Sequence, residues 1–295
     1  MNVLNIQGIS KRYGVVQALK NVSFSVPQGS VFGILGPNGS GKTTLLGIVM
    51  DVLKATSGTF TFFDKVPDEN QRKQMGTLLE TPNFYHYLSA QKNLEIVAAI
   101  KGQSRKDIAR VLEVVNLTQR KDSPFTTFSL GMKQRLAIAS CLLGNPEIMV
   151  FDEPTNGLDP VGIAEIRELI KRLHQEGKTI IMASHLLDEV EKVCSHVAIL
   201  KKGELLTTGD VNEILANEDI VEIGAENLEQ LTGVALSLHN DTKYKIENNL
   251  LQLFYPVGTA NMGEINKYCF DKGITLNHLQ MKKKSLETKF FELTN

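Results

Sequence analysis

The chain has 295 residues, of which 42% are hydrophobic and 22% are charged. This length is enough for one large core and a small second domain. With 32 basic and 33 acidic side chains the net charge is −1, so the composition gives no indication of a nucleic-acid-binding surface, and we expect no nucleic-acid partner.

The cysteines and the amino terminus indicate an intracellular chain. Cys141, Cys194 and Cys269 are far apart and have no histidine at metal-ligand spacing, which favours free thiols in a reducing compartment. The first residues lack the basic and apolar regions of a signal peptide, and no apolar run approaches the ~20 residues that a membrane span needs.

The first 30 residues alternate as short strands around Tyr13-Gly14 and Pro27-Gln28-Gly29. This pattern predicts an antiparallel sheet. Tyr13 stands just before a loop, where its ring could stack on a planar ligand or pack on this first sheet.

A glycine-rich loop follows between a strand-like run at 31–35 and a helix-like run at 44–50. Its residues fill every fixed position of G-x-x-x-x-G-K-[ST] and are Gly36, Pro37, Asn38, Gly39, Ser40, Gly41, Lys42 and Thr43. Glycines allow positive φ, so backbone N–H groups can converge on a triphosphate at the start of the helix that Thr44 opens. Lys42 would reach the β- and γ-phosphates, and the Thr43 hydroxyl would be a Mg²⁺ ligand.

Between Glu80 and Phe128 the strand pattern disappears and apolar residues recur at helical spacing. This segment predicts a helical insert at about 81–128. Its start, residues 82–88, is aromatic and loop-like, and these rings form either a small local core or a surface for a partner.

An acidic pair ends the buried-strand pattern of the four apolar residues 148–151. Asp152 and Glu153 would lie at the carboxyl edge of the sheet, where ligands bind in open α/β folds. Asp152 would hold Mg²⁺ through water, and Glu153 would orient or deprotonate the attacking water. His185 ends another strand-like run, at 179–184, which would lie beside the first and direct the histidine at the γ-phosphate.

The run Phe128-Ser129-Leu130-Gly131-Met132 lies upstream of the acidic pair, and Pro154-Thr155-Asn156-Gly157-Leu158-Asp159-Pro160 lies directly after it. Ser129 suits the N-cap of a helix over 130–143, whose amino end would form a second anion site. With Tyr13, His185 and the phosphate loop, these motifs resemble the ATP-binding subunits of ABC transporters over residues 1–215.

The resemblance implies a role for each of these residues. Tyr13 would stack on adenine, Ser129 and Gly131 would belong to the signature loop, Asp159 to the D-loop, and His185 would be the switch histidine. Two subunits would pair head to tail as a homodimer, so that the signature helix of one closes on the γ-phosphate held by the other. The implied fold is an α/β P-loop NTPase of the ABC type, with a mixed sheet core, a helical insert and an N-terminal antiparallel sheet.

Two positions depart from the family pattern. The signature Leu-Ser-Gly-Gly-Gln reads Phe-Ser-Leu-Gly-Met at 128–132, although Ser129 and Gly131 are retained. The glutamine of the family's Q-loop corresponds to Glu80, which is either a carboxylate facing the metal or an outward-facing loop residue. Both departures resemble the exporter ATPases that handle bacitracin and lantibiotics.

Residues 216–295 carry no such motif and predict a small α+β domain. Segments 219–223, 242–247 and 250–255 have strand patterns, whereas 261–272 predicts a helix closed by Gly273. The run 285–293 resembles the terminal helix of resistance-type exporter ATPases. Lys282-Lys283-Lys284 is more typical of a solvated edge than of a lipid contact.

The function that follows is an ATP- and Mg²⁺-dependent ATPase subunit that energises a membrane exporter through ATP-driven dimer closure. Its cargo would be antimicrobial peptides, drugs or lipid-like compounds. An integral-membrane permease would dock at the helical insert, which places the chain in the cytoplasm, peripheral on the inner face of the cell membrane. The alternative is a soluble ABC ATPase with a non-membrane partner, but the single phosphate loop and the lack of a heptad run disfavour it.

Overall fold

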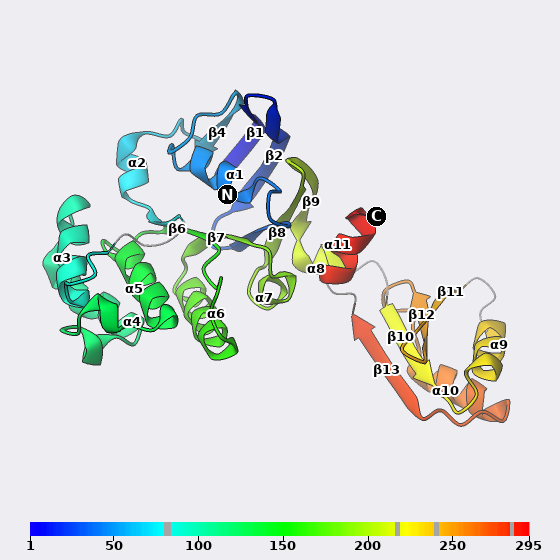
Figure 1. Cartoon of the computed structure of the whole chain (residues 1–295). Helices are drawn as coiled ribbons and strands as arrows, with labels where there is room; N and C mark the ends of the chain where they lie inside the picture. Colours follow the sequence, from blue (N-terminus) through cyan, green and yellow to red (C-terminus); the bar gives the residue numbers. More distant parts are fainter. Residues whose placement is uncertain (80–83, 216–218, 239–241, 284–285, 295) are drawn as a thin grey trace. The chain divides into compact units, whose positions relative to one another are not determined.

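The computed structural model of the chain (Figure 1) describes residues 1–79, 84–215, 219–238, 242–283 and 286–294. These residues form two compact units, Met1–Asp210 and Val211–Asn295. Within the described ranges, no helix is long and apolar enough to cross a bilayer.

The larger sheet of the first unit contains six strands from the described residues, in the order β5-β6-β7-β3-β8-β9. All neighbouring pairs are parallel except β8 and β9. The residues of β3, β6 and β7 are almost all apolar and are buried without exception, as expected for parallel strands covered on both faces. The bounds are β3 Val31–Leu35, β5 Gly76–Leu78, β6 Ile148–Asp152, β7 Thr179–Ser184, β8 His196–Lys201 and β9 Glu204–Asp210.

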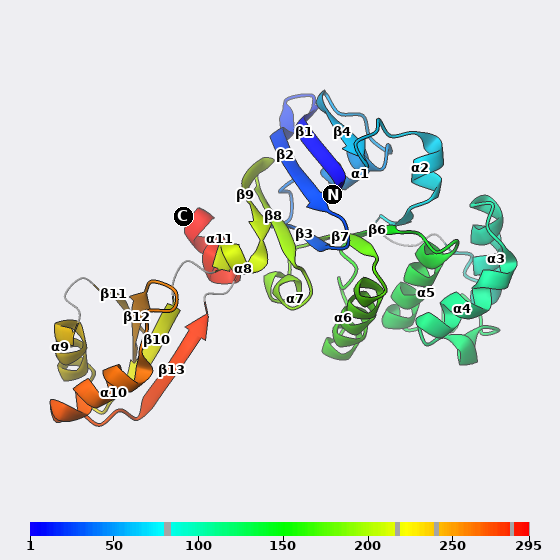
Figure 2. The same ribbon diagram turned by 180° about the vertical axis from the view of Figure 1, so that it is seen from behind.

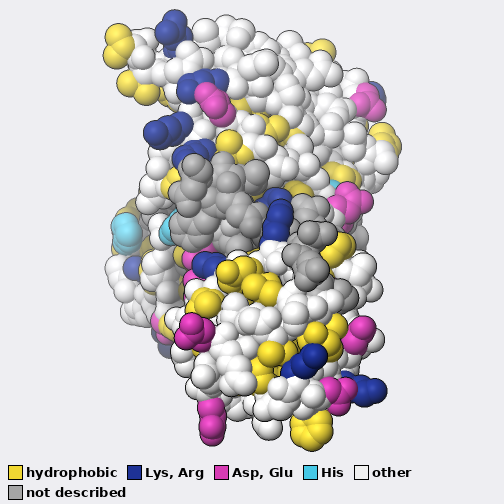
Figure 3. Space-filling view, turned by 90° about the vertical axis from the view of Figure 1, so that its right-hand side faces the viewer, with side chains coloured by type: hydrophobic (Ala, Val, Ile, Leu, Met, Phe, Trp, Pro, Cys, Tyr) yellow, Lys and Arg dark blue, Asp and Glu magenta, His cyan; other side chains and the backbone are white. Residues whose placement is uncertain are grey.

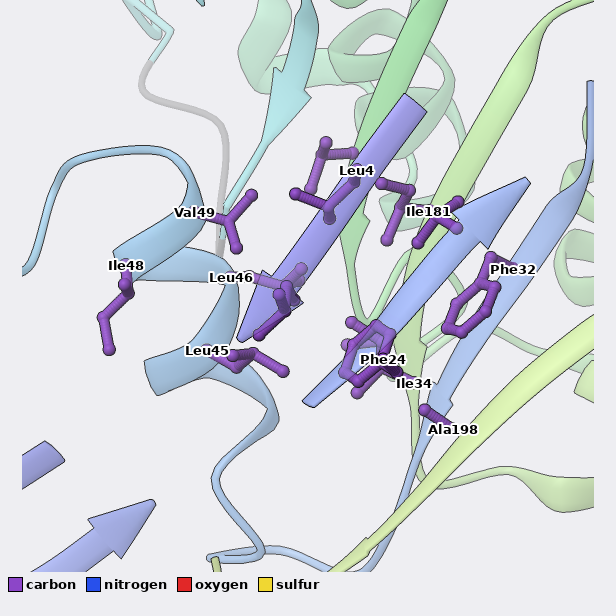
Figure 4. Packing of buried hydrophobic residues seen from close by; sticks show 14 of the residues in the cluster. Leu4, Phe24, Phe32, Ile34, Leu45, Leu46, Ile48, Val49, Ile181 and Ala198 are labelled. Atoms are coloured by element: carbon purple, nitrogen blue, oxygen red, sulfur yellow. The ribbon is translucent and has the colours of Figure 1, made fainter. Parts of the chain in front are cut away.

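A three-stranded antiparallel sheet, ordered β2-β1-β4, completes the mixed α/β core. The amino-terminal segment predicted to form short strands folds instead as two twelve-residue strands, β1 Asn2–Tyr13 and β2 Val16–Pro27. The third strand, β4 Ser57–Phe62, comes from beyond the phosphate loop and was not predicted. Side chains from both sheets and from α1 meet in one core (Figure 4), where the rings of Phe24 and Phe32 stack with centroids 5.2 Å apart.

The helices of the first unit divide into two groups. Helices α3, α4 and α5 contact one another and gather on one side of the unit in both views (Figures 1 and 2), and α3 and α4 lie in the predicted insert. Of the remaining helices, α1 and α6 both contact strand β7. The bounds are α1 Lys42–Val49, α2 Glu69–Lys73, α3 Ala90–Ile100, α4 Ile108–Val114, α5 Leu130–Leu142, α6 Pro160–Gln175 and α7 Leu187–Glu191, with short 3-10 turns at 105–107, 118–120 and 125–127.

The second unit is a βαββαβ arrangement with a sheet ordered β11-β12-β10-β13, every neighbouring pair antiparallel. This order is that of a ferredoxin-like split β-α-β motif. Its core contains Val221, Leu231, Leu253 and Ile265. The bounds are α8 Val211–Leu215, β10 Asp219–Gly224, α9 Leu228–Leu238, β11 Lys243–Glu247, β12 Leu250–Tyr255, α10 Met262–Asp271, β13 His278–Lys283 and α11 Leu286–Thr294.

The polar residues of the second unit include one buried acid. Glu222, on the central strand β10, is 4% exposed. It accepts a hydrogen bond from Gln252 Nε2 at 2.9 Å, and its Oε2 lies 2.8 Å from Lys282 Nζ and 3.6 Å from His278 Nε2. Lys282, interpreted from sequence as part of a solvated edge, lies on the edge strand β13 with its side chain 49% exposed, and it also pairs with an acid of the neighbouring strand.

Two further features concern side chains in both units. Cys141, Cys194 and Cys269 are all buried free thiols, in agreement with the sequence prediction.

On the face of the molecule shown in Figure 3, basic, acidic and hydrophobic side chains are intermixed, as expected from the nearly neutral net charge.

Candidate active site

The phosphate loop joins β3 to α1, and its shape depends on its glycines. Gly36 has φ 154° and Gly41 has φ 108°, backbone angles that residues with a side chain rarely adopt. A Cβ at Gly36 would lie 2.3 Å from the Leu200 carbonyl oxygen, and one at Gly41 would lie 2.7 Å from Leu19 Cδ2. The loop is thus pressed against strands β8 and β2, and no larger residue fits at either position.

A pocket of about 570 Å³ opens over this loop. Its volume is within the usual range for a small-molecule site. It is lined by Val16, Gln17, Ala18, Lys20, Asn38, Gly39, Ser40, Gly41, Lys42, Thr43, Thr44, Glu153 and Lys202. The sequence predicted the loop residues and Glu153, whereas the β2 residues and Lys202 carry no motif and become neighbours of the loop only in the folded chain.

Three predicted residues meet at the carboxyl edge of the parallel sheet. Lys42 Nζ donates to the Gly36 carbonyl oxygen at 2.8 Å and lies 3.3 Å from Glu153 Oε1. The other oxygen of Glu153 lies 2.8 Å from His185 Nδ1. When Nδ1 carries the proton, its N–H donates a hydrogen bond to this carboxylate, and Nε2 remains available as a hydrogen-bond acceptor. The site therefore connects Lys42 to Glu153 and Glu153 to His185 in a continuous series of polar contacts.

The neighbouring strands explain why Glu153 and His185 meet. β6 and β7 are parallel, with Asp152 opposite Ala183, so both strands end at one edge of the sheet. Glu153 has φ 49°, and its N–H donates to the Ala183 carbonyl oxygen at 3.0 Å. This left-handed backbone is uncommon for glutamate and turns the side chain from the end of its own strand toward Lys42 and His185.

Asp152 and Thr43 are suited to a magnesium ion. Asp152 is 4% exposed at the end of β6, and a carboxylate buried to that extent needs cationic or hydrogen-bonding partners. Carboxylate and hydroxyl oxygens are hard ligands of the kind that Mg²⁺ prefers. Among the described residues no cluster of three His, Cys, Asp or Glu could hold a metal.

The signature residues and Asp159 of the D-loop lie outside the phosphate-loop pocket of their own chain. Ser129 is the N-cap of α5, and its Oγ accepts from the Met132 N–H at 3.3 Å. Asp159 is the N-cap of α6 and accepts from the Gly162 N–H at 2.8 Å. Neither these residues nor Gly131 line the phosphate-loop pocket, so one chain does not bring the two predicted anion sites together.

Tyr13 and Glu80 complete the predicted set. Tyr13 is 45% exposed at the end of β1, opposite Val16, which lines the pocket. Lys11 Nζ lies 5.0 Å from the centroid of its ring, so a cation covers part of the aromatic surface. Glu80 lies outside the described residues.

Comparison with known proteins identifies the family. The family model for ABC transporters matches residues 19–156. The bacitracin transport ATP-binding protein BcrA of Bacillus licheniformis is 35% identical over 99% of this chain and 97% of its own length. The lantibiotic transport ATP-binding protein SrtF of Streptococcus pyogenes is 37% identical over 78% of this chain and 95% of its own length. The chain belongs to the ABC transporter ATP-binding proteins.

Solved structures agree with this assignment. The cbiO1 subunit of a Clostridium perfringens ABC transporter complex superposes with a TM-score of 0.67 at 30% identity, covering 81% of this chain and 96% of that one. A dimeric ATP-binding cassette in a post-hydrolysis state with ADP and Pi superposes with a TM-score of 0.63 at 27% identity, covering 70% of this chain and 98% of that one. The sequence predictions of family, fold and ATPase activity are confirmed: this ABC protein binds and hydrolyses ATP to energise membrane transport.

Proposed function

We propose that this ABC protein energises the export of membrane-active peptide antibiotics. The contact chain from Lys42 through Glu153 to His185 supports the hydrolytic activity, and the bacitracin and lantibiotic transport proteins among its relatives support the cargo class. BcrA aligns over 99% of this chain, so the similarity includes the second unit. These relatives favour transport over the alternative of a non-membrane partner.

Each residue of the site has a chemical task. The phosphate loop binds the triphosphate through its backbone N–H groups, and Lys42 leaves its present oxygen partners to contact phosphate oxygens. Thr43 and Asp152 would hold Mg²⁺, which when bound neutralises phosphate charge. Glu153 takes a proton from water as the water oxygen bonds to the γ-phosphorus and the bond to the ADP oxygen breaks. His185 holds the carboxylate in position for that transfer.

Hydrolysis on this scheme requires a second copy of the chain. Ser129 and Gly131 lie at the exposed start of α5, away from the pocket of their own chain. The N–H groups and dipole at that helix start favour an anion. In a head-to-tail homodimer, this helix start would close on the triphosphate held by the partner's phosphate loop, as in the family.

The start of the helical insert is suited to a permease. Phe84 is 9% exposed and its ring packs 5.2 Å from that of Phe125, whereas Tyr85 and Tyr87 are 50% and 76% exposed. Asn93 is buried and bonds both the N–H and the carbonyl oxygen of Tyr85, at 2.7 and 3.1 Å, which fixes the loop with its two tyrosines outward. The stretch therefore contains both a local core and a docking surface, and docking would place the chain on the cytoplasmic face of the membrane.

The experiment is a resistance assay with the chain and its permease expressed in a sensitive host. The parent should raise the minimal inhibitory concentration of bacitracin or of a lantibiotic, and Glu153→Gln should not, although it should still copurify with the permease. Equal inhibitory concentrations for parent and variant across both peptide classes would contradict the proposed cargo while leaving the ATPase assignment intact.

A further inference from the structure

Lys202 is a nucleotide-pocket residue that no sequence motif marks. It lies in the two-residue turn between β8 and β9, where Lys201 pairs with Glu204. Its side chain is exposed, and it lines the same pocket as Lys42, Thr43 and Glu153. The pocket thus has a lysine on the wall that the β8–β9 hairpin contributes.

The turn is fixed to the phosphate loop by backbone contacts. The Gly203 N–H donates to the Ser40 carbonyl oxygen at 3.0 Å, and the Gly203 carbonyl oxygen accepts from the Lys20 N–H at 2.8 Å. A Cβ at Gly203 would lie 2.6 Å from the Ala18 carbonyl oxygen, so the turn is packed closely against β2. Lys202 is therefore held at a set position relative to the loop that binds the phosphates.

The backbone of Lys202 is unfavourable for a lysine. Lys202 and Gly203 have φ 50° and 82°, the positive pair of a type I′ hairpin turn, whose first position favours Asn, Asp or Gly. Among the residues that the structure describes, ten non-glycine residues have positive φ, and seven are Asn or Asp. The exceptions are Phe63, Glu153 and Lys202, and two of them line the nucleotide pocket. A lysine at a position where Asn would be less strained points to a role for its side chain.

The charges around the pocket leave Lys202 available for a ligand. Lys42 Nζ lies 3.3 Å from Glu153 Oε1, and Lys20 Nζ lies 2.8 Å from Glu204 Oε1. Within the described part of the chain, Lys202 forms no ion pair. We propose that Lys202 binds the phosphate chain of the nucleotide from the hairpin side of the pocket and is a further binding residue of this ATPase.

The test is the substitution Lys202→Asn, because asparagine suits the turn but cannot bind phosphate by charge. The variant should melt at or above the temperature of the parent, yet bind ADP about three- to tenfold more weakly in a calorimetric titration, since a charge contact partly in water is of modest strength. Adenosine, measured by competition, should bind equally to both proteins. Lys202→Arg should bind ADP within about twofold of the parent.

A matched control is Lys201→Asn, which removes the same charge from a neighbouring side chain that does not line the pocket. It should leave ADP affinity unchanged. Raising the salt concentration should weaken ADP binding to the parent more steeply than to Lys202→Asn. Unchanged ADP affinity in Lys202→Asn, an equal loss for adenosine, or an Arg variant as weak as the Asn variant would each overturn the proposal.

Discussion

Each unit contains a poorly exposed glutamate beside a lysine and a histidine, but the two clusters lie at different places in a strand. Glu153 follows the last residue of a parallel strand, with φ 49°, and faces the pocket that Lys42 lines. Glu222 lies in the middle of an antiparallel strand, opposite Gln252 and Gln280, and Lys282 is its diagonal neighbour. We therefore expect the same residue types to serve catalysis at a strand end and sheet stability at a strand centre. Position within the fold, rather than composition, decides the role.

The largest expected difference between the clusters is in turnover. Glu153→Gln should bind ATP yet lose ~10²- to 10⁴-fold in hydrolysis, the usual contribution of a general base. Its matched control is Glu222→Gln, which makes the same change in the second unit and should hydrolyse ATP within about twofold of the parent. Steady-state ATPase assays decide the matter, and parental turnover in Glu153→Gln would remove the assignment of the base.

The next effect concerns stability and pH. Burial raises the pKa of Glu222, but hydrogen bonds from Lys282 and Gln252 outweigh it, so the pKa is lowered overall from its usual 4.5. An acid with a lowered folded pKa stabilises the fold above its unfolded pKa, and this contribution is lost as the pH falls through the folded value. Glu222→Gln should therefore lower the free energy of unfolding by about 1–3 kcal/mol at pH 7.

The measurement is a denaturant titration of parent and Glu222→Gln between pH 7 and pH 3. The difference between the two proteins should shrink as the pH falls below 4.5, where Glu222 begins to take up a proton in the unfolded chain. A difference that is constant over this range would show that the charge of Glu222 does not stabilise the sheet.

The smallest expected effect is that of removing the second unit. A chain that ends at Asp210 retains the whole phosphate-loop pocket, since every lining residue lies in the first unit. ADP affinity, measured by calorimetry, should stay within about threefold of the full chain. A folded truncated chain that no longer binds ADP would show that residues beyond 210 contribute to the site.

The features predicted correctly from sequence are those that neighbouring residues determine. The phosphate loop, the strand-end acids and the cap at Ser129 each depend on a few residues in a row. The strand at Ser57–Phe62 was missed because its partner, β1, lies some fifty residues earlier in the chain. Lys202 and the Glu222 cluster were missed for the same reason, since contacts between distant strands define both.

The aromatic stretch at 82–88 shows a second kind of limit. Phe84 is in the core and Tyr87 is in solvent, although they are three residues apart in a segment without regular periodicity. A loop has no fixed repeat from which burial can be predicted. The contact of Phe84 with Phe125 and the hydrogen bonds of Asn93 decide which rings are buried and which are exposed.

The burial of the three thiols makes the natural chain suitable for site-specific labelling. Burial raises the pKa of Cys141 to about 11, and it also raises the pKa of Cys194 and Cys269. Only about one in 10⁴ Cys141 side chains is then a thiolate at neutral pH, and the thiolate is the reactive form. A cysteine introduced at the exposed Tyr87 would react with a maleimide far faster, so a fluorescent probe can test the proposed docking surface without removal of the native cysteines.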